Sequence, residues 1–244
     1  MKFIKSKLAF TLIELLVVIT IIAVLASIAL PVFTSVQTKG AQTKALSNAK
    51  QIALALRLYA SDNGGIYPSY TLQSGQPSTN PVQDSNTAFA ELFPTYIQEE
   101  RIFYLPKSQW TPTQPDEVTD SAANDQGQYT NTLKAGENEW AYVLGLNDSS
   151  NPAVPLLADG FTTGGATSHT YTVDQSQKGG VWKAQKAIVV NADSSGNLDS
   201  VSQTNFTVTG PNGSTTGAQG DIFTTSNAST GWLGQANIVV NPKQ

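Results

Sequence analysis

One acidic residue, Glu14, stands inside an otherwise uncharged apolar stretch near the start of the chain. Lys2, Lys5 and Lys7 precede it, and the next charged residue after it is Lys39. A charged side chain at the centre of a bilayer costs about 2.5–3.5 kcal/mol on insertion scales, so an ionised Glu14 needs a cationic partner. The chemistry that this spacing indicates is charge pairing in an apolar environment.

The apolar stretch itself contains no lysine or arginine that could pair with Glu14. A cut between Ala9 and Phe10 removes a leader of residues 1–9, with its three lysines, and creates a new cation, the α-amine of Phe10. At about 1.5 Å per residue, that amine lies roughly one turn from Glu14 in the same helix. The two groups can instead pair between neighbouring subunits staggered along their axes, and such pairing sets the register of a polymer.

The segment from Phe10 to Leu30 is long enough to cross a membrane as a helix. A helix rises about 1.5 Å per residue, and the hydrocarbon core of a bilayer is about 30 Å thick. The basic residues lie before this segment and none follows until Lys39, a charge asymmetry that places the N-terminus in the cytoplasm. We therefore expect a single span, with the C-terminal bulk of the chain on the other side.

Residues 7–19, Lys-Leu-Ala-Phe-Thr-Leu-Ile-Glu-Leu-Leu-Val-Val-Ile, closely resemble the processing segment of type IV pilins and type II secretion pseudopilins. In that family a membrane-embedded prepilin peptidase cuts before the Phe and methylates the new amine, and the Glu guides the subunit into a helical filament. The resemblance implies cleavage between Ala9 and Phe10, N-methylation of Phe10 and assembly through Glu14. The family usually has Gly where Ala9 stands. Pro31 matches the family's proline in the N-terminal helix, where we expect a kink.

The resemblance also implies a location and a set of partners. The protein is expected in the bacterial inner membrane, with a periplasmic C-terminal domain, before it enters a pilus or pseudopilus. Its implied partners are a prepilin peptidase, an inner-membrane assembly platform, a cytoplasmic ATPase and other pilin-like subunits of a homo-oligomeric filament. The alternative is a minor or tip subunit whose globular domain binds a substrate or surface.

Two other interpretations of the N-terminal segment compete with this one. The first is an ordinary secretory signal that is cut after Ser27-Ile28-Ala29, a small-x-small sequence. That signal accounts for the lysines but not for Glu14, because such signals keep their hydrophobic region uncharged. The second is a plain anchor that holds a periplasmic domain to the membrane.

Helical periodicity continues beyond the apolar stretch. Apolar residues recur at intervals of four and three, which predicts one buried stripe on an amphipathic helix. The stripe consists of Ala45, Ala49, Ile52, Leu56 and Tyr59. The Asn and Gly residues of 61–65 favour the left-handed backbone that ends helices. We expect one long helix over 10–60 with its transmembrane half at 10–30, and two helices broken at Pro31 are the alternative.

Two later segments add further resemblances. Residues 56–68 resemble the helix exit of major pseudopilins, where a Tyr, an Asp-Asn-Gly turn and a Tyr-Pro follow one another. This favours a secretion pseudopilin over an adhesive pilin. Residues 89–97 and 103–106 resemble large pseudopilin-like proteins from bacteria such as Verrucomicrobia and Planctomycetes, many of which have a cysteine where Leu105 stands.

The pattern beyond the helix predicts an α+β fold, in which the helix packs on a mainly antiparallel sheet. Residues 61–134 are rich in loops, with an exposed loop over 69–86 and a short helix near 87–97. Residues 135–244 alternate short apolar stretches with turns, and 193–197 form the clearest hairpin. The expected strands are 140–144, 154–158, 170–173, 187–191, 198–201, 205–208 and 237–240. An exposed loop is expected over 210–220, between the last two strands.

Composition excludes several classes of protein. The chain has no cysteine, which excludes disulfides, a lipoprotein anchor and thiolate metal sites. Lys plus Arg number 14 against 18 Asp plus Glu, and loss of the three leader lysines changes the formal charge from −4 to −7. The acidic residues are scattered and no basic patch is present, which argues against nucleic acid as a partner.

The sequence offers no catalytic constellation, so we expect a protein that is not an enzyme. His169 is the single histidine and no G-x-S-x-G motif is present, so we interpret His169 as a surface loop residue. Asp159-Gly160 and residues 193–199 carry oxygen ligands of the kind that calcium prefers, and some major pseudopilins bind calcium in C-terminal loops. Turn formation explains these residues equally well, so we expect no cofactor, with calcium as the alternative. The tryptophans are interpreted as core or edge anchors: Trp110, Trp140, Trp182 and Trp232.

Overall fold

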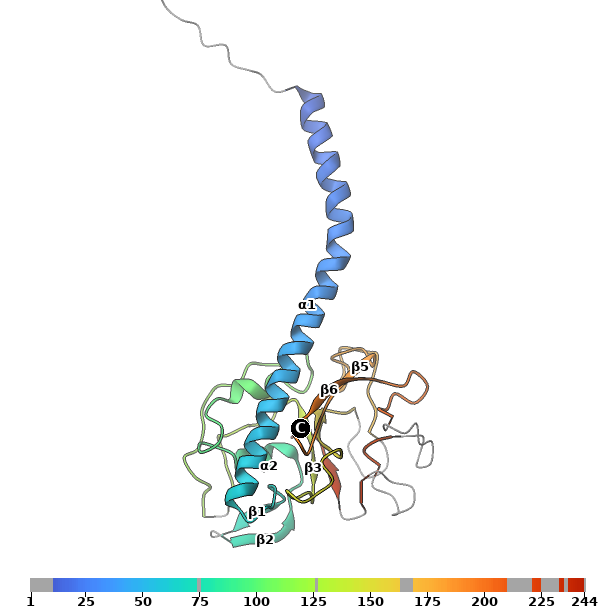
Figure 1. Cartoon of the computed structure of the whole chain (residues 1–244). Helices are drawn as coiled ribbons and strands as arrows, with labels where there is room; N and C mark the ends of the chain where they lie inside the picture. The colour runs from blue at the N-terminus through green and yellow to red at the C-terminus, as the bar shows by residue number, and fades with distance from the viewer. Residues whose placement is uncertain are drawn as a thin grey trace, which may run out of the picture. The chain divides into compact units, whose positions relative to one another are not determined.

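The structure is a computed structural model with an α+β fold, formed by one long N-terminal helix and a mainly antiparallel β-rich part (Figure 1). The chain divides into two compact units, Met1–Thr43 and Lys44–Gln244. The described residues are 11–73, 76–125, 127–162, 169–209, 221–224, 233–234 and 237–243.

Helix α1 runs from Leu12 to Asp62 and contains Pro31 in its interior. Because the helix continues through this proline, the alternative of two separate helices is wrong. The helix ends where the Asn and Gly residues predict, since Gly64 and Gly65 have φ angles of 66° and 84°. The amide of Gly65 donates to the carbonyl of Ala60 at 2.7 Å, which closes the last turn.

The second unit is organised around a five-stranded sheet with the order β6-β5-β4-β3-β7, in which every neighbouring pair is antiparallel. Its strands are β3 (Trp140–Leu144), β4 (Pro155–Asp159), β5 (Lys186–Asn191), β6 (Gly196–Ser200) and β7 (Ile238–Val240). The expected hairpin across 193–197 joins β5 to β6, with Ser194 in the left-handed region at φ 64°. The last strand, β7, returns to pair with β3, and Val239 lies opposite Val143.

Four of the five residues of the apolar stripe of α1 are buried within the second unit, as its periodicity predicts, and Tyr59 is half-buried. Ala45 is 3% exposed, and Ala49, Ile52 and Leu56 are fully buried. The helix lies against the β5–β6 hairpin, because a Cβ atom placed on Gly196 would lie 3.0 Å from a methyl group of Leu46. Glycine at the start of β6 therefore permits the close approach of helix and sheet.

Two expected strands are wrong. Residues 170–173 and 205–208 contain no strand. The Tyr171 amide donates a hydrogen bond to the Phe206 carbonyl at 2.8 Å, but no ladder forms between the two segments. Phe206 has a φ of 57°, a left-handed conformation that interrupts an extended chain. Residue 208 forms an isolated antiparallel bridge with Val201 rather than a ladder.

The expected exposed loop over 69–86 is also wrong. Its centre forms a two-stranded hairpin of β1 (Tyr70–Gln73) and β2 (Gln76–Pro81). Its end is buried, since Ser85 and Asn86 are 0% and 2% exposed. The Ser85 hydroxyl donates to the Trp140 carbonyl at 2.6 Å, and the side-chain amide of Asn86 donates to the Leu133 carbonyl at 2.7 Å. Polar residues that find backbone partners can be buried at little cost, and composition alone does not reveal those partners.

The short helix expected near 87–97 is present as α2 (Ser85–Ala90), which begins two residues earlier. The Asp84 carboxylate accepts a hydrogen bond from the Thr87 amide at 2.9 Å and caps the helix. Turns continue to residue 96, and a 3₁₀ helix, η1 (Glu100–Phe103), follows. Phe89 packs against Phe103 and Tyr142 at ring distances of 5.4 and 5.2 Å, which joins both helices to the sheet.

Three of the four tryptophans lie in the core. Trp110, Trp140 and Trp182 are 2%, 1% and 8% exposed, which confirms their interpretation as anchors. Trp232 and the expected loop over 210–220 lie outside the described residues.

Two carboxyl groups, Glu139 and Asp159, are fully buried beside this core. The Asp159 carboxylate accepts hydrogen bonds from the Ile188 amide at 2.7 Å and from the Trp182 indole at 3.0 Å. Burial raises the pKa of Asp159 to about 7, although these two hydrogen bonds act to lower it. Burial and the neighbouring charge of Asp159 raise the pKa of Glu139 well above its usual value. The folded protein therefore holds protons that an unfolded chain releases near pH 4.

These protons predict that the free energy of unfolding falls as the pH rises from about 4 to 7 through the titration of Asp159. The sign follows because the folded state binds more protons than the unfolded state in this range. We expect Asp159→Asn to reduce this slope. Urea unfolding of the full chain in detergent, followed by tryptophan fluorescence at several pH values, measures it.

Glu99→Gln is the matched control, because Glu99 is exposed and its side chain makes no cap hydrogen bond. It should leave the slope unchanged. A slope that is identical in wild type and Asp159→Asn contradicts the assignment of the titration to this group.

A second prediction concerns Gly160, which follows β4 directly. A Cβ atom there would lie 2.5 Å from the Trp110 ring and 2.8 Å from the Glu139 carbonyl, so backbone or ring must move. We expect Gly160→Ala to lower the free energy of unfolding by about 1–3 kcal/mol, the usual cost of overpacking. Urea midpoints measure the effect.

Gly40→Ala serves as the control, since Gly40 is helical and nothing lies within 4 Å of the added methyl group. Alanine there is expected to favour the helix by about 0.5–1 kcal/mol. Equal midpoints for wild type and Gly160→Ala would show that the close packing at Gly160 is unimportant.

Candidate functional site

The first turn of α1 is closed by a reciprocal pair of hydrogen bonds between Thr11 and Glu14. The Thr11 amide and hydroxyl donate to one carboxylate oxygen of Glu14 at 2.8 and 2.7 Å. The Glu14 amide in turn faces the Thr11 hydroxyl oxygen at 3.3 Å. This is a capping box, in which an acidic side chain satisfies a free amide at the helix N-terminus. Glu14 therefore has polar partners within its own chain in the isolated subunit.

The helix that follows is apolar on all its sides as far as Phe33. Residues 11–40 are all exposed, among them Leu12, Ile13 and Leu30 at 78%, 72% and 65%. Within the described part of the chain, α1 is the one helix long and apolar enough to cross a bilayer. A helix that is apolar all round is suited to lipid or to the interior of an assembly. The apolar helix is consistent with membrane anchoring.

Of the other expected site residues, the structure describes Pro31 but not Ala9 and Phe10. Ala9 and Phe10, which flank the expected cut, lie outside the described residues. Pro31 lies inside α1, and the hydroxyl of Thr34 donates to its carbonyl at 2.9 Å. Of the expected site residues, Glu14 is thus the one whose side-chain hydrogen bonds are defined.

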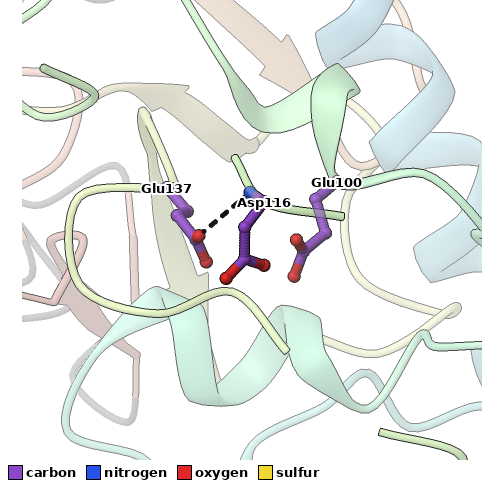
Figure 2. A group of neighbouring side chains, drawn as sticks. All are labelled: Glu100, Asp116 and Glu137. Atoms are coloured by element: carbon purple, nitrogen blue, oxygen red, sulfur yellow. Dashed lines mark hydrogen bonds between the residues drawn. The ribbon is translucent and has the colours of Figure 1, made fainter. Parts of the chain in front are cut away.

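A second cluster of polar residues lies in the second unit, where three carboxyl groups converge from separate loops. Glu100, Asp116 and Glu137 each offer an oxygen, and these oxygens lie within 4.8 Å of one another (Figure 2). Glu100 begins η1, and the other two come from the irregular segment that precedes β3. We call these three residues the acidic triad. The sequence did not predict it, because no motif or regular spacing links the three positions.

The acidic triad is held largely by backbone amides. The Leu133 amide donates to Glu100 at 2.6 Å, and the Lys134 amide donates to Glu137 at 2.6 Å. The Asp116 amide also donates to Glu137, at 3.3 Å. Such bonds fix the directions of the carboxyl groups and leave further lone pairs available.

The electrostatics of the acidic triad differ from one member to the next. Burial raises the pKa of Glu100 to about 7, and the charges of Glu137 and Asp116 act in the same direction. The Lys134 ammonium lies 2.7 Å from Asp116, and this hydrogen bond lowers the pKa of that carboxyl. A buried, protonatable group thus lies next to a carboxylate that remains charged.

The positions expected to offer calcium ligands are not brought together in the described residues. Asp159 is buried and accepts its hydrogen bonds from Trp182 and Ile188. Asp193 accepts from the Ser195 amide at 2.7 Å, which is the bond of a turn. Where the structure is described, the carboxyl groups that could share one metal ion are those of the acidic triad.

His169 is buried, so its interpretation as a surface residue is wrong. Its Nδ1 atom lies 2.8 Å from the carboxylate of Asp221, and the two side chains are 0% and 1% exposed. Phe161 and Phe223 pack on the imidazole ring at 5.0 and 5.8 Å. Asp221, whose hydrogen bond compensates the burial of the imidazole, is 52 positions away in the sequence. The residues next to His169 therefore do not predict its burial.

A cavity of 260 Å³ lies beside the exit of α1 and is lined by Arg57, Tyr67, Asp148 and Asp193, among others. The guanidinium of Arg57 donates to the carbonyl of Asp193 at 3.2 Å. The charged side chains that line this cavity are of both signs.

Comparison with known proteins identifies the N-terminal segment. The family model described as the prokaryotic N-terminal methylation motif matches residues 4–30. Neither the curated proteins nor the solved structures gave a match to the chain. The matched residues include the whole capping box and most of the apolar helix. The chain therefore carries the N-terminal methylation segment of type IV pilins and pseudopilins, which supports a pilin-like subunit in general.

Proposed function

We propose that this chain is a structural subunit of a type II secretion pseudopilus or a type IV pilus-like filament. In this proposal a prepilin peptidase cuts between Ala9 and Phe10 and methylates the new amine, and the subunits polymerise through α1. The observation that carries the proposal is the methylation motif over residues 4–30, with Glu14 as the one acidic residue of the apolar stretch.

The driving interaction is charge pairing between the carboxylate of Glu14 and the amine of Phe10 on a neighbouring subunit. In the isolated subunit Glu14 accepts hydrogen bonds from Thr11, which lower the cost of placing it in lipid but leave its charge uncompensated. A cation from the next subunit removes that residual cost and fixes the axial stagger. Salt bridges of this kind are strongest where water is excluded.

The exposed apolar side chains of the first unit supply the second contribution. Residues such as Leu12, Ile13 and Leu30 exchange contacts with lipid for contacts with other helices when the subunit enters a filament. Helix association in lipid is driven by packing and polar contacts rather than by the hydrophobic effect. Glu14 therefore provides specificity, and the apolar surface provides the packing area.

The orientation and partners follow from the same segment. Lys2, Lys5 and Lys7 keep the N-terminus in the cytoplasm, so the second unit lies outside the inner membrane. A membrane-embedded peptidase, an assembly platform and a cytoplasmic ATPase act on the subunit, and turnover chemistry belongs to them. The helix-exit segment at residues 56–68 favours a secretion pseudopilus over an adhesive pilus.

The proposal predicts that Glu14→Ala inserts into the membrane normally but enters filaments poorly. Loss of an ion pair in an apolar environment removes more than about 1.4 kcal/mol, so incorporation should fall by roughly tenfold or more. Immunoblots of sheared filaments and membrane fractions from producing cells measure incorporation and insertion separately.

Two further variants separate charge from helix capping. Glu14→Gln retains an oxygen that can accept from Thr11 but has no charge, and we expect it to fail like Glu14→Ala. Thr20→Val removes a hydroxyl that bonds to the Val17 carbonyl in the same helix and should assemble normally. Normal incorporation of Glu14→Gln would contradict the charge-pairing mechanism.

A further inference from the structure

We propose that the acidic triad, Glu100, Asp116 and Glu137, is a binding site for a hard divalent cation of the calcium class. This site lies in the second unit and is separate from the proposed filament function, which neither requires nor excludes it. Three features support this site: the convergence of the three carboxyl groups, a buried oxygen without a partner among the described residues, and the charges around them.

The convergence has nearly the right dimensions for one ion. Three carboxyl oxygens within 4.8 Å of one another have a common centre at most about 2.8 Å from each, so shifts of a few tenths of an ångström bring them into the range of calcium–oxygen distances, about 2.3–2.6 Å. Figure 2 shows the three side chains pointing toward one another from separate segments of the chain. Like charges at this separation repel, and a shared cation converts that repulsion into attraction.

The buried oxygen is Oε2 of Glu100. Glu100 is 0% exposed, and this oxygen has no hydrogen-bond partner in the described part of the chain, while the other accepts from Leu133. A buried carboxyl oxygen that is left unsatisfied costs free energy, so it calls for a bound proton or a cation. The raised pKa of Glu100 has the same origin, because protonation and metal binding are alternative ways of neutralising this group.

The surrounding cations do not complete the neutralisation. Lys134 pairs with Asp116 at 2.7 Å, and Arg101 lies 3.5 Å from Glu117, whose carboxylate accepts from the Glu100 amide. For Glu100 and Glu137, no lysine, arginine or histidine lies within ion-pair distance among the residues described. A divalent cation together with Lys134 balances the three carboxylates.

The ligand chemistry selects the class of ion. All three side chains offer oxygen, the chain has no cysteine, and its single histidine is engaged with Asp221. Zinc and other soft or borderline metals prefer nitrogen and sulfur. Magnesium demands a near-ideal octahedron and retains its waters, whereas calcium accepts irregular sets of carboxylates and carbonyls. The Asp116 side chain is 45% exposed and leaves the site open to solvent on one side.

Such an ion would link three segments that have little regular structure of their own: η1, the loop at 116 and the approach to β3. Anything that binds the folded state and not the unfolded state raises stability by mass action. Calcium is therefore expected to raise the unfolding temperature of the second unit.

The test uses the full chain in detergent micelles, stripped with EDTA and then titrated with CaCl2 or MgCl2. We expect the unfolding temperature, followed by tryptophan fluorescence, to rise saturably with CaCl2 at concentrations up to about 5 mM, and to rise less with MgCl2. Asp116→Asn removes a charge from the exposed side of the site and should weaken the apparent calcium affinity by roughly tenfold or more. Isothermal titration calorimetry of both proteins with CaCl2 provides an independent measure.

Two variants make the result specific. Asp193→Asn makes the same chemical change in the β5–β6 turn, where asparagine can also accept from Ser195, and should leave the calcium response unchanged. Lys134→Met removes the competing cation and should bind calcium at least as tightly as the wild type.

The proposal is overturned if the unfolding temperature is the same in EDTA and in CaCl2. It is equally overturned if Asp193→Asn abolishes the response while Asp116→Asn retains it, which would move the ion to the hairpin. Filament incorporation of Asp116→Asn is measured in parallel, so that a failure of the cation site is distinguished from a failure of the proposed function.

Discussion

A single carboxylate in an apolar helix is the constraint on which this molecule depends. Glu14 is the one charged residue between the leader lysines and Lys39, and the cost of burying it in lipid must be met by polar partners. Within one chain those partners are the amide and hydroxyl of Thr11, arranged as a capping box. In the proposed filament the compensating charge is the amine of Phe10 on the next subunit. The capping box and the proposed intersubunit pair use the same carboxylate. In the proposed function the first lowers the cost of placing the helix in lipid, and the second directs assembly.

Helix α1 meets two different requirements along its length. Its first part is exposed and apolar on every side, which suits lipid and a filament interior. Its second part is amphipathic and buries Ala49, Ile52 and Leu56 within the second unit. The sequence marks this change by the basic residues that begin at Lys39. The second unit also contains buried carboxyl groups. Burial raises the pKa values of Glu100, Glu139 and Asp159.

The sequence predicts features that depend on neighbours along the chain and misses features that depend on distant partners. The stripe of α1, the strand at 140–144 and the β5–β6 hairpin follow from local periodicity and turn residues. The pairing of His169 with Asp221 and the acidic triad depend on loops that meet only after folding. The expected strand at 205–208 does not form, because Phe206 adopts a left-handed backbone conformation that is uncommon for phenylalanine and that the sequence does not predict. The cut before Phe10 is predicted by the residues around it and lies outside the described structure.

The most direct test of the account is the N-terminus of the protein recovered from producing cells. N-terminal sequencing combined with intact mass measures where the mature chain begins and whether its amine is modified. The account predicts a chain that starts at Phe10 and carries an added methyl group. A mature chain that still begins with Met1 leaves no amine beside Glu14, and one that begins at Leu30 has lost Glu14 altogether. Either result would contradict the charge pairing proposed for assembly.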